Sequence, residues 1–134
     1  MPVVFTHNFD VGRFDVALLG RPSWSEETVI IGNKLTFHEL ASLAEKAKGT
    51  KLAVVHDSVE DLEACKLTEL SSHREVYKLY PKEVILHSLL FLLGLACERG
   101  QANLNPGGTL NDELPEIRPI RAREVLEKGW GKLR

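Results

Sequence analysis

A long apolar run in the second half of the chain constrains the fold more than any other sequence feature. The run begins at Pro81 and ends at Gly100. Proline is favoured in the first turn of a helix and glycine just after its last turn, so we expect one helix over residues 82–99. Apolar residues cover nearly the whole circumference of this helix. It must therefore be buried by its own fold, by a second copy or by a partner.

The apolar run is too short to cross a lipid bilayer. Its core, Val84–Cys97, is about 14 residues long, whereas a membrane-spanning helix needs roughly 20. The N-terminus has neither a basic region nor a long apolar stretch, so we expect no signal peptide and no membrane contact. The two cysteines, Cys65 and Cys97, show neither a disulfide framework nor a CxxC spacing. We therefore expect a reduced, cytoplasmic protein.

Composition indicates a folded domain. The chain has 134 residues, of which 43% are hydrophobic and 27% are charged. These values are typical of globular proteins, and the length predicts a single domain over residues 1–134. The single methionine is compatible with a thermophilic source.

Alternation of β-rich runs and helical patterns predicts an α/β fold. Short links join the first three runs, which favours an antiparallel N-terminal meander. Later runs alternate with helices, which predicts a continuation into a βαβαβ arrangement with helices packed on a small mixed sheet. The expected strands are Val3–Thr6, Asp15–Leu19, Thr28–Ile31, Leu52–His56 and Glu75–Tyr80.

Helix-capping signals mark where several helices begin and end. Thr36 and Glu39 have the spacing of a capping box before an amphipathic helix over residues 37–48. Gly49 suits the left-handed residue that ends such a helix. Further helices are expected after the N-cap Ser58 and over Pro119–Lys128, the latter following a loop over residues 101–117.

Basic residues are concentrated at the C-terminus. Residues 118–134 contain six Lys and Arg against two acids, which is +4, while the other 117 residues contain eleven against seventeen, which is −6. Such a tail can contact the acidic body, a second copy or nucleic acid. The nucleic-acid candidates are Arg118, Arg121, Arg123 and Lys128, with Lys132 and Arg134 beyond them.

Polar side chains at the expected strand ends form a candidate ligand site. Open α/β sheets bind ligands beyond the carboxyl ends of their strands. Right-handed crossovers would set the later strands parallel to the third, so their ends would share one rim with that of the first. This rim would hold His7, Asn8, Asn33, Lys34, His56, Asp57, Ser58 and Lys82.

The rim residues suit general acid–base chemistry or anion binding. The catalytic candidates are His7, His56 and Asp57, because histidine titrates near neutral pH and a carboxylate can orient it. A structural interpretation stands beside this one, in which residues 56–58 are a strand end, a turn and an N-cap. The anion-binding candidates are Lys34, Ser58 and Lys82, since helix N-termini attract anions.

Standard motifs for nucleotide and metal binding are absent from the sequence. It contains no GxGxxG, no GxxxxGK followed by Ser or Thr, and no GxSxG. It also lacks HExxH and paired-cysteine spacings. We therefore expect neither a cofactor nor a metal.

The leading interpretation of function is a non-catalytic assembly or accessory module that self-associates, as in a homodimer, or binds a protein partner. One alternative is a small enzyme or an anion- or nucleotide-binding protein that uses the rim. Another is a nucleic-acid-associated protein that uses the basic tail. The interface candidates are apolar and aromatic side chains of the kind that interfaces favour: Leu86, Leu89, Leu90, Leu93, Trp24 and Trp130.

Overall fold

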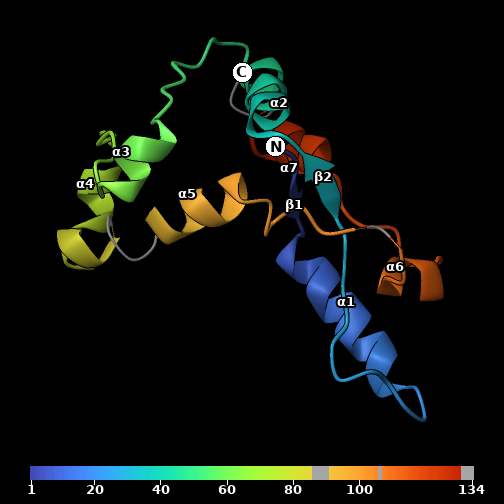
Figure 1. Ribbon diagram of the computed structural model, residues 1–134. Helices are drawn as coiled ribbons and strands as arrows, with labels where there is room; N and C mark the ends of the chain where they lie inside the picture. The colour runs from blue at the N-terminus through green and yellow to red at the C-terminus, as the bar shows by residue number, and fades with distance from the viewer. Residues whose placement is uncertain (86–90, 106, 131–134) are drawn as a thin grey trace. The chain divides into compact units, whose positions relative to one another are not determined.

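The chain forms two compact units. The computed structural model describes residues 1–85, 91–105 and 107–130 (Figure 1). Unit 1 comprises Met1–Leu52 and Ala102–Arg134, and unit 2 comprises Ala53–Gln101. A single domain over residues 1–134 stays a prediction. The elements in chain order are β1 (Val3–Phe5), α1 (Asn8–Leu19), β2 (Asn33–Leu35), α2 (Phe37–Lys48), α3 (Val59–Glu63), α4 (His73–Val76), α5 (Phe91–Glu98), α6 (Leu110–Glu113) and α7 (Ala122–Trp130).

Unit 1 contains a short antiparallel sheet formed by β1 and β2, the strands before and after α1. β1 pairs with β2 so that Val3 lies opposite Leu35 and Phe5 lies opposite Asn33. Val4 uses its N–H to reach the carbonyl of Ala102 at 2.9 Å. The expected mixture of helices and strands is thus confirmed, but within residues 1–85, 91–105 and 107–130 the sheet has two strands and no βαβαβ arrangement.

Four of the five expected strands have a different structure. Asp15–Leu19 is the end of α1, and Glu75–Tyr80 continues from α4 into turns. Thr28–Ile31 and Leu52–His56 are irregular segments. In the last of these, Val54 and Val55 are 50% and 56% exposed.

The helical period explains the structure of α1. Phe14 is fully buried, and Ala17 and Leu18, three and four residues later, pack beside it. Side chains at these spacings share one face of a helix. The apolar alternation read as a strand therefore belongs to one buried stripe and one exposed stripe of the same helix.

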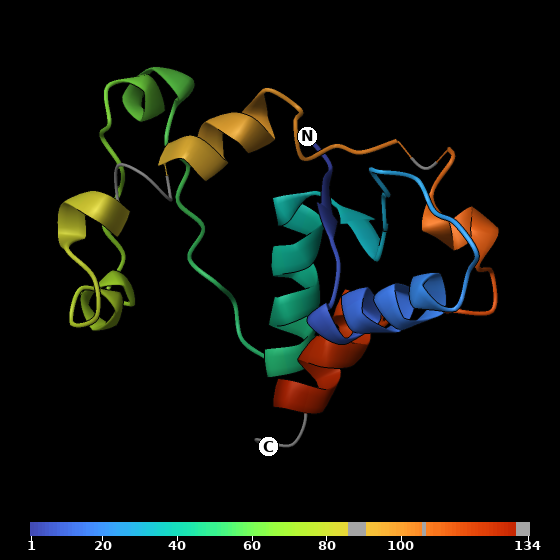
Figure 2. The same ribbon diagram turned by 90° about the horizontal axis from the view of Figure 1, so that it is seen from below.

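The core of unit 1 forms where α1 meets α6. Phe14 packs with Leu110 and Leu114, and Ile30 and Ile117 cover the edge of this cluster. The segment between α1 and β2 runs back beside α1 on its way to the sheet (Figures 1 and 2). Apolar residues from three distant parts of the chain thus share one core.

Side-chain bonds from α6 hold that returning segment. Asn111 accepts a hydrogen bond from the N–H of Ile31 at 2.8 Å and donates one to the carbonyl of Ile31 at 3.0 Å. Leu110 donates its N–H to the carbonyl of Val29 at 2.9 Å. The backbone polar groups of this irregular segment are thereby satisfied without a strand partner.

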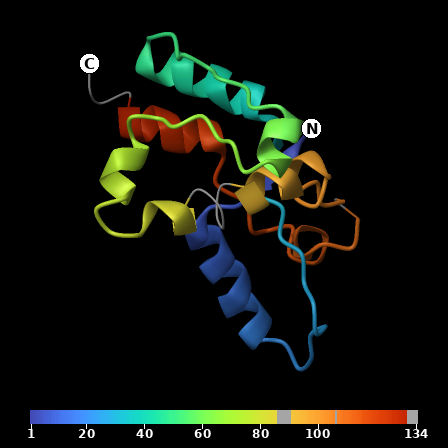
Figure 3. The same ribbon diagram turned by 60° about the vertical axis from the view of Figure 1, so that its left-hand side comes forward.

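The predicted helix over residues 37–48 is confirmed as α2. Its capping box is formed by Thr36 and Glu39, and Gly49 ends it with φ of 74°. Ala44 and Ala47 are buried, and α2 packs along α7 (Figure 3). The predicted C-terminal helix is likewise confirmed as α7, with its start three residues later than expected.

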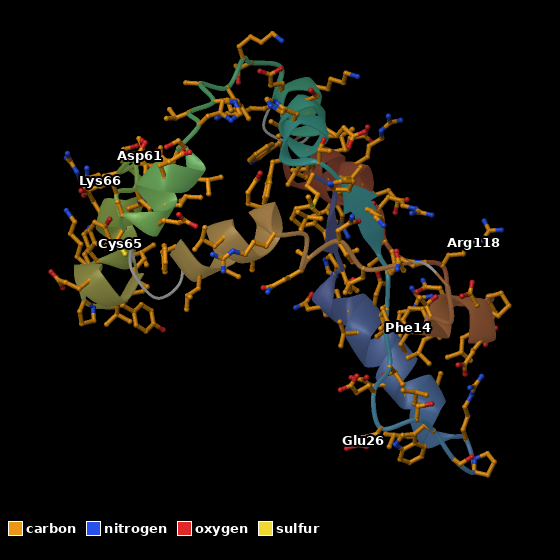
Figure 4. All side chains as sticks on the ribbon, in the orientation of Figure 1. Phe14, Glu26, Asp61, Cys65, Lys66 and Arg118 are labelled. Atoms are coloured by element: carbon orange, nitrogen blue, oxygen red, sulfur yellow. The ribbon has the colours of Figure 1, made fainter. Side chains whose placement is uncertain are left out.

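Unit 2 is built from short helices. Ser58 caps α3 as predicted, accepting the N–H of Asp61 at 3.0 Å. After α3, Cys65 has a positive φ of 54°, and Lys66 bonds back to the carbonyl of Asp61 at 2.7 Å (Figure 4). α5 packs against α3, with the methyl groups of Leu62 lying over Gly94.

The long apolar helix predicted over residues 82–99 is not present as such in the described chain. Residues 82–85 form one helical turn, and α5 spans eight residues, Phe91–Glu98. Gly100 follows α5 with φ of 77°, as expected for a helix exit. Residues 86–90 lie outside the described residues.

The predicted interface residues differ in burial. Leu93 and Trp24 are 54% and 55% exposed. Trp130 is half-buried, with the Lys48 ammonium 5.8 Å from its ring centre. Leu86, Leu89 and Leu90 lie outside the described residues. None of the helices in the described ranges is both long and apolar enough to span a membrane.

Candidate functional site

An apolar cavity lies in unit 1, between the sheet and the helices α2 and α7. Its volume is about 210 Å³. We call it the His7 cavity. Its lining is mostly hydrocarbon, with three polar side chains, and consists of Phe5, Thr6, His7, Asn33, Leu40, Ile120, Ala122, Val125 and Leu126.

Buried polar side chains position the segment around Ile120 that lines one side of this cavity. Asp10 is fully buried and accepts the N–H of Ile120 at 2.7 Å. Asn33, 9% exposed, donates to the carbonyl of Ile120 at 3.0 Å and accepts the N–H of Ala122 at 3.1 Å. Both backbone groups of Ile120 are therefore held by side chains more than 80 residues away in the chain.

Two arginines add further support to the same segment. The Arg13 guanidinium bridges the Asp10 carboxylate and the carbonyl of Arg118, at 3.0 Å in each case. Arg121 donates to the carbonyl of Gly32 at 3.1 Å. Charge-assisted bonds of this kind are roughly twice as strong as neutral ones, so the approach to α7 is well fixed.

His7 is the N-cap of α1 and borders the cavity. Its Nδ1 accepts the N–H of Phe9 at 3.2 Å, which is shared with Asn8 Oδ1 at 3.0 Å, and its ring stacks on that of Phe9 with centres 5.2 Å apart. An imidazole nitrogen that accepts a hydrogen bond is unprotonated, so the neutral ring carries its proton on Nε2. In this tautomer the ring has a hydrogen-bond donor at Nε2.

The other polar side chains of the cavity are engaged in the fold. The Thr6 hydroxyl donates to the carbonyl of Ile30 at 3.3 Å and accepts the N–H of Gly32 at 3.2 Å. Asn33 uses both its amide oxygen and its amide nitrogen on the segment before α7. Among the polar side chains that line the cavity, His7 is therefore the one suited to bind a ligand.

A second hollow adjoins the His7 cavity. It has a volume of about 410 Å³ and shares His7, Ile120 and Val125 with the first. Phe9 forms part of its wall, and Glu124 and Lys128 of α7 supply charge. The imidazole of His7 thus lies at the boundary between an apolar and a more polar space.

The predicted rim does not form as reasoned from the sequence. It depended on strands over residues 28–31 and 52–56, and both segments are irregular. The rim residues also divide between the units, with His7, Asn8, Asn33 and Lys34 in unit 1 and His56, Asp57, Ser58 and Lys82 in unit 2. His7 remains a site candidate for another reason, which is its place at the cavity.

The unit 2 candidates make local structural bonds. Asp57 accepts the N–H of Thr68 at 3.1 Å. Lys82 donates to Glu69 at 2.6 Å, and this bond raises the pKa of Lys82 and lowers the pKa of Glu69. His56 is exposed. Their roles in catalysis or anion binding stay predictions, as does that of Lys34, which donates to the carbonyl of Leu104.

The basic residues of the tail that the structure describes line different surface features, and Lys132 and Arg134 lie outside the described residues. Arg121 and Arg123 line a groove beside α2, whereas Lys128 lines the hollow next to His7. Arg118 is exposed. Nucleic-acid binding by this region stays a prediction. Across the described ranges, no group of three or more His, Cys, Asp or Glu is placed to hold a metal ion.

Comparison with known proteins relates the chain to enzymes. It is 30% identical over 131 residues to the oxidoreductase swnN of Metarhizium robertsii, which covers 96% of this chain and 38% of that protein. Oxidoreductase swnN of Arthroderma benhamiae is 27% identical over 96% of this chain and 47% of its own. Oxidoreductase BOA1 of Botryotinia fuckeliana is 32% identical, and the match covers 92% of this chain and 37% of that protein. No family model and no solved structure matches the sequence.

These relatives overturn the leading interpretation from the sequence. The prediction of a non-catalytic assembly or accessory module is wrong, because proteins that match nearly the whole chain are named oxidoreductases. The alternative of an enzyme or a ligand-binding protein agrees better with them. The chain spans less than half of the length of each of these relatives.

Proposed function

We propose that this chain is part of an oxidoreductase and that unit 1 supplies its substrate-binding cavity. The observation that carries the proposal is the match to three oxidoreductases over 92–96% of the chain. The His7 cavity has the usual character of a ligand site, namely an apolar lining with a few placed polar groups. A small, mainly apolar organic molecule with one hydrogen-bond acceptor fits this lining.

His7 is the residue proposed to orient that acceptor. A two-electron reduction of a carbonyl or imine places developing negative charge on its oxygen or nitrogen. A fixed N–H donor directed at this atom stabilises the charge without reorganisation during the reaction. The N–H of Phe9, shared between His7 Nδ1 and Asn8 Oδ1, favours the neutral His7 tautomer that presents Nε2–H.

We assign redox-cofactor binding to the part of the longer relatives that lies outside the segment matching this chain. Two observations support this division. The chain spans less than half of each relative, and its sequence carries no dinucleotide fingerprint.

An exposed apolar face of α1 supports the same division. Phe9, Val16 and Leu19 are 71%, 71% and 73% exposed, and their spacing places them on one side of the helix. Exposed apolar side chains on one side of a helix are suited to an interaction surface. We assign it to contact with the cofactor-binding part, and because Phe9 also lines the hollow beside His7, that contact would border the substrate site.

Ligand binding to the cavity is tested by NMR on the isotope-labelled chain. Cyclohexanone and acetophenone are added as probes, and saturable shifts are expected at His7, Leu40 and Val125. His7→Asn keeps an N-cap acceptor but removes the Nε2 donor, so it should weaken binding. His73→Asn is the matched control, since His73 also accepts a backbone N–H at 3.2 Å but lies in unit 2. Probe binding that is equally strong in His7→Asn and in the unmodified chain would contradict the proposed site.

The proposed role of this chain in an oxidoreductase is tested by exchanging it for the matching segment of a relative. The matching segment of the Metarhizium robertsii relative is replaced by this chain, and turnover is measured with that relative's own substrate and reductant. We expect turnover to persist and His7→Asn to lower it about 100-fold, as for loss of a placed proton or hydrogen-bond donor. A well-folded exchange protein without turnover would refute the proposal.

A further inference from the structure

A groove on unit 1 collects basic residues from two segments that are far apart in the sequence. It lies between α2, β2 and the start of α7 and has a volume of about 430 Å³. We call it the α2–α7 groove. Its hydrogen-bonding side chains include His38, Glu39, Ser42, Lys46, Arg121 and Arg123.

The groove is positive although the whole chain is negative. Lys46, Arg121 and Arg123 contribute three cations against the single carboxylate of Glu39, while the chain has a net charge of −2. The Glu39 carboxylate is already bound, accepting the N–H of Thr36 at 2.7 Å and its hydroxyl at 2.9 Å. A concave surface lined by one sign of charge concentrates ions of the other sign.

One of the arginines is held in place by the fold. Arg121 donates one N–H to the carbonyl of Gly32 at 3.1 Å, and a guanidinium has five N–H donors in a planar fork. Its remaining donors can bind both oxygens of a carboxylate or phosphate. Arg123 lies on the first turn of α7, and the Ser42 hydroxyl adds a neutral donor from α2.

We propose that the α2–α7 groove binds the oxyanion of a small molecule, either a carboxylate or a phosphate group. The groove is distinct from the His7 cavity, although Asn33 borders both. Asn33 holds the backbone of Ile120 and Ala122, so the wall between the two spaces is built by buried, satisfied polar contacts. The proposal does not depend on the redox role of the chain.

The test is an NMR titration of the whole chain at constant ionic strength. Inorganic phosphate, malonate and AMP are added separately, and saturable shifts are expected at Ser42, Arg121 and Arg123. Arg123→Gln should raise the Kd about tenfold, which is the effect of losing one charge-assisted bond. The Kd of Arg123→Lys should lie between that of the unmodified chain and that of Arg123→Gln. Lys128→Gln, on the same helix but outside the groove, should leave the Kd within about twofold. Tighter malonate binding identifies an organic acid as the ligand, and tighter AMP binding identifies a phosphate ester.

Several outcomes would overturn the proposal. Equal losses in Arg123→Gln and Lys128→Gln, or shifts that never saturate, would mean general attraction of anions. A single-stranded oligonucleotide that binds without being displaced by phosphate would identify a nucleic-acid surface instead. Circular dichroism checks the fold, and Lys46→Gln repeats the test if Arg123→Gln unfolds. If the unmodified chain binds phosphate but no ketone in the His7 cavity, the proposed substrate cavity is refuted and the proposal for the α2–α7 groove stands.

Discussion

Unit 1 and unit 2 are stabilised by contacts of different range. In unit 1, the buried side chains of Asp10 and Asn33 bind backbone groups that lie 87 to 110 residues away in the chain. In unit 2, the side-chain contacts of the described residues span fewer positions, 13 between Glu69 and Lys82 and 36 between Glu63 and Arg99. Long-range bonds made by buried groups depend on the whole fold, whereas short-range exposed bonds depend on a turn or a helix end.

The difference also concerns burial. Unit 1 has the cluster of Phe14, Leu110 and Leu114, each at most 8% exposed. In the described part of unit 2, Leu95 is the buried apolar residue, and the ion pair of Glu63 with Arg99 is exposed. Exposed ion pairs contribute little to stability. The His7 cavity and the α2–α7 groove therefore belong to the unit whose side chains are the better fixed.

The largest loss of stability is expected from truncating a side chain in the core of unit 1. Phe14→Ala should lower the free energy of unfolding by about 3–5 kcal/mol, because it removes buried surface and leaves a cavity. Leu79→Ala in unit 2, where the side chain is 77% exposed, should change it by less than about 0.5 kcal/mol. Urea denaturation followed by circular dichroism measures both. Similar losses in the two variants would remove the contrast between the units.

Local signals in the sequence predicted local structure well. The capping box of Thr36 and Glu39, the exit at Gly49 and the N-cap Ser58 are all present. Each depends on residues within a few positions, so the sequence contains the whole interaction. The first strand is also confirmed, as β1.

Strand assignments failed where the outcome depends on a distant partner. Asp15–Leu19 alternates like a strand, yet Phe14 and Leu18 face one core as part of a helix. Leu52–His56 is apolar enough for a buried strand, but Val54 and Val55 are exposed and no described strand pairs with the segment. Pairing and covering are properties of the assembled fold, and a short window of sequence does not contain them.

The site shows the same limit. His7 was named from its position after a strand, and the structure places it beside a cavity by another route, as the cap of α1. Asp10 was missed, because the group that it binds, the N–H of Ile120, lies 110 residues away. Its signal was weak but present: Asp10 precedes the buried Phe14 by one helical turn, so a carboxylate shares the apolar face.

Removing the long-range carboxylate should produce the next largest effect. Asp10→Ala leaves the N–H of Ile120 and one Arg13 bond unpaired, which should lower the free energy of unfolding by about 2–3 kcal/mol. Asp15→Ala, on the exposed side of the same helix, should change it by less than about 0.5 kcal/mol. Chemical denaturation of the two variants makes the comparison. Equal stabilities would mean that the buried bond network of unit 1 contributes nothing measurable.

A pair of glycine substitutions separates close packing from chain flexibility. At Gly32 an added Cβ would lie 2.5 Å from the Phe5 carbonyl oxygen, so Gly32→Ala should destabilise unit 1 by about 1–2 kcal/mol. At Gly12, within α1, an added Cβ meets nothing within 4 Å. Gly12→Ala should therefore stabilise by about 0.5–1 kcal/mol through its helix propensity. Thermal unfolding measures the sign of the stability change in each variant. A stabilising effect of Gly32→Ala would contradict the close approach of β1 to Gly32.

The smallest effect is expected from exposed acids, and it should be alike in the two units. The Thr36 N–H, and after it the Thr36 hydroxyl, lowers the pKa of Glu39 in unit 1, while Lys82 lowers the pKa of Glu69 in unit 2. A carboxyl whose pKa is lower in the folded chain binds fewer protons there than in the unfolded chain. Its contribution to stability is complete above the ordinary pKa near 4.5 and is lost as the pH falls through the folded value.

Glu39→Gln and Glu69→Gln should each make stability slightly less dependent on pH on the acid side, with little change at neutral pH beyond the lost bond itself. Both carboxyls are exposed to solvent, which keeps the effect small. Denaturation midpoints measured from pH 3 to pH 7 compare each variant with the unmodified chain. A flattened acid limb in only one of them would show that local contacts, too, act differently in the two units. An unchanged acid limb in both would mean that neither bond favours the ionised carboxylate in solution.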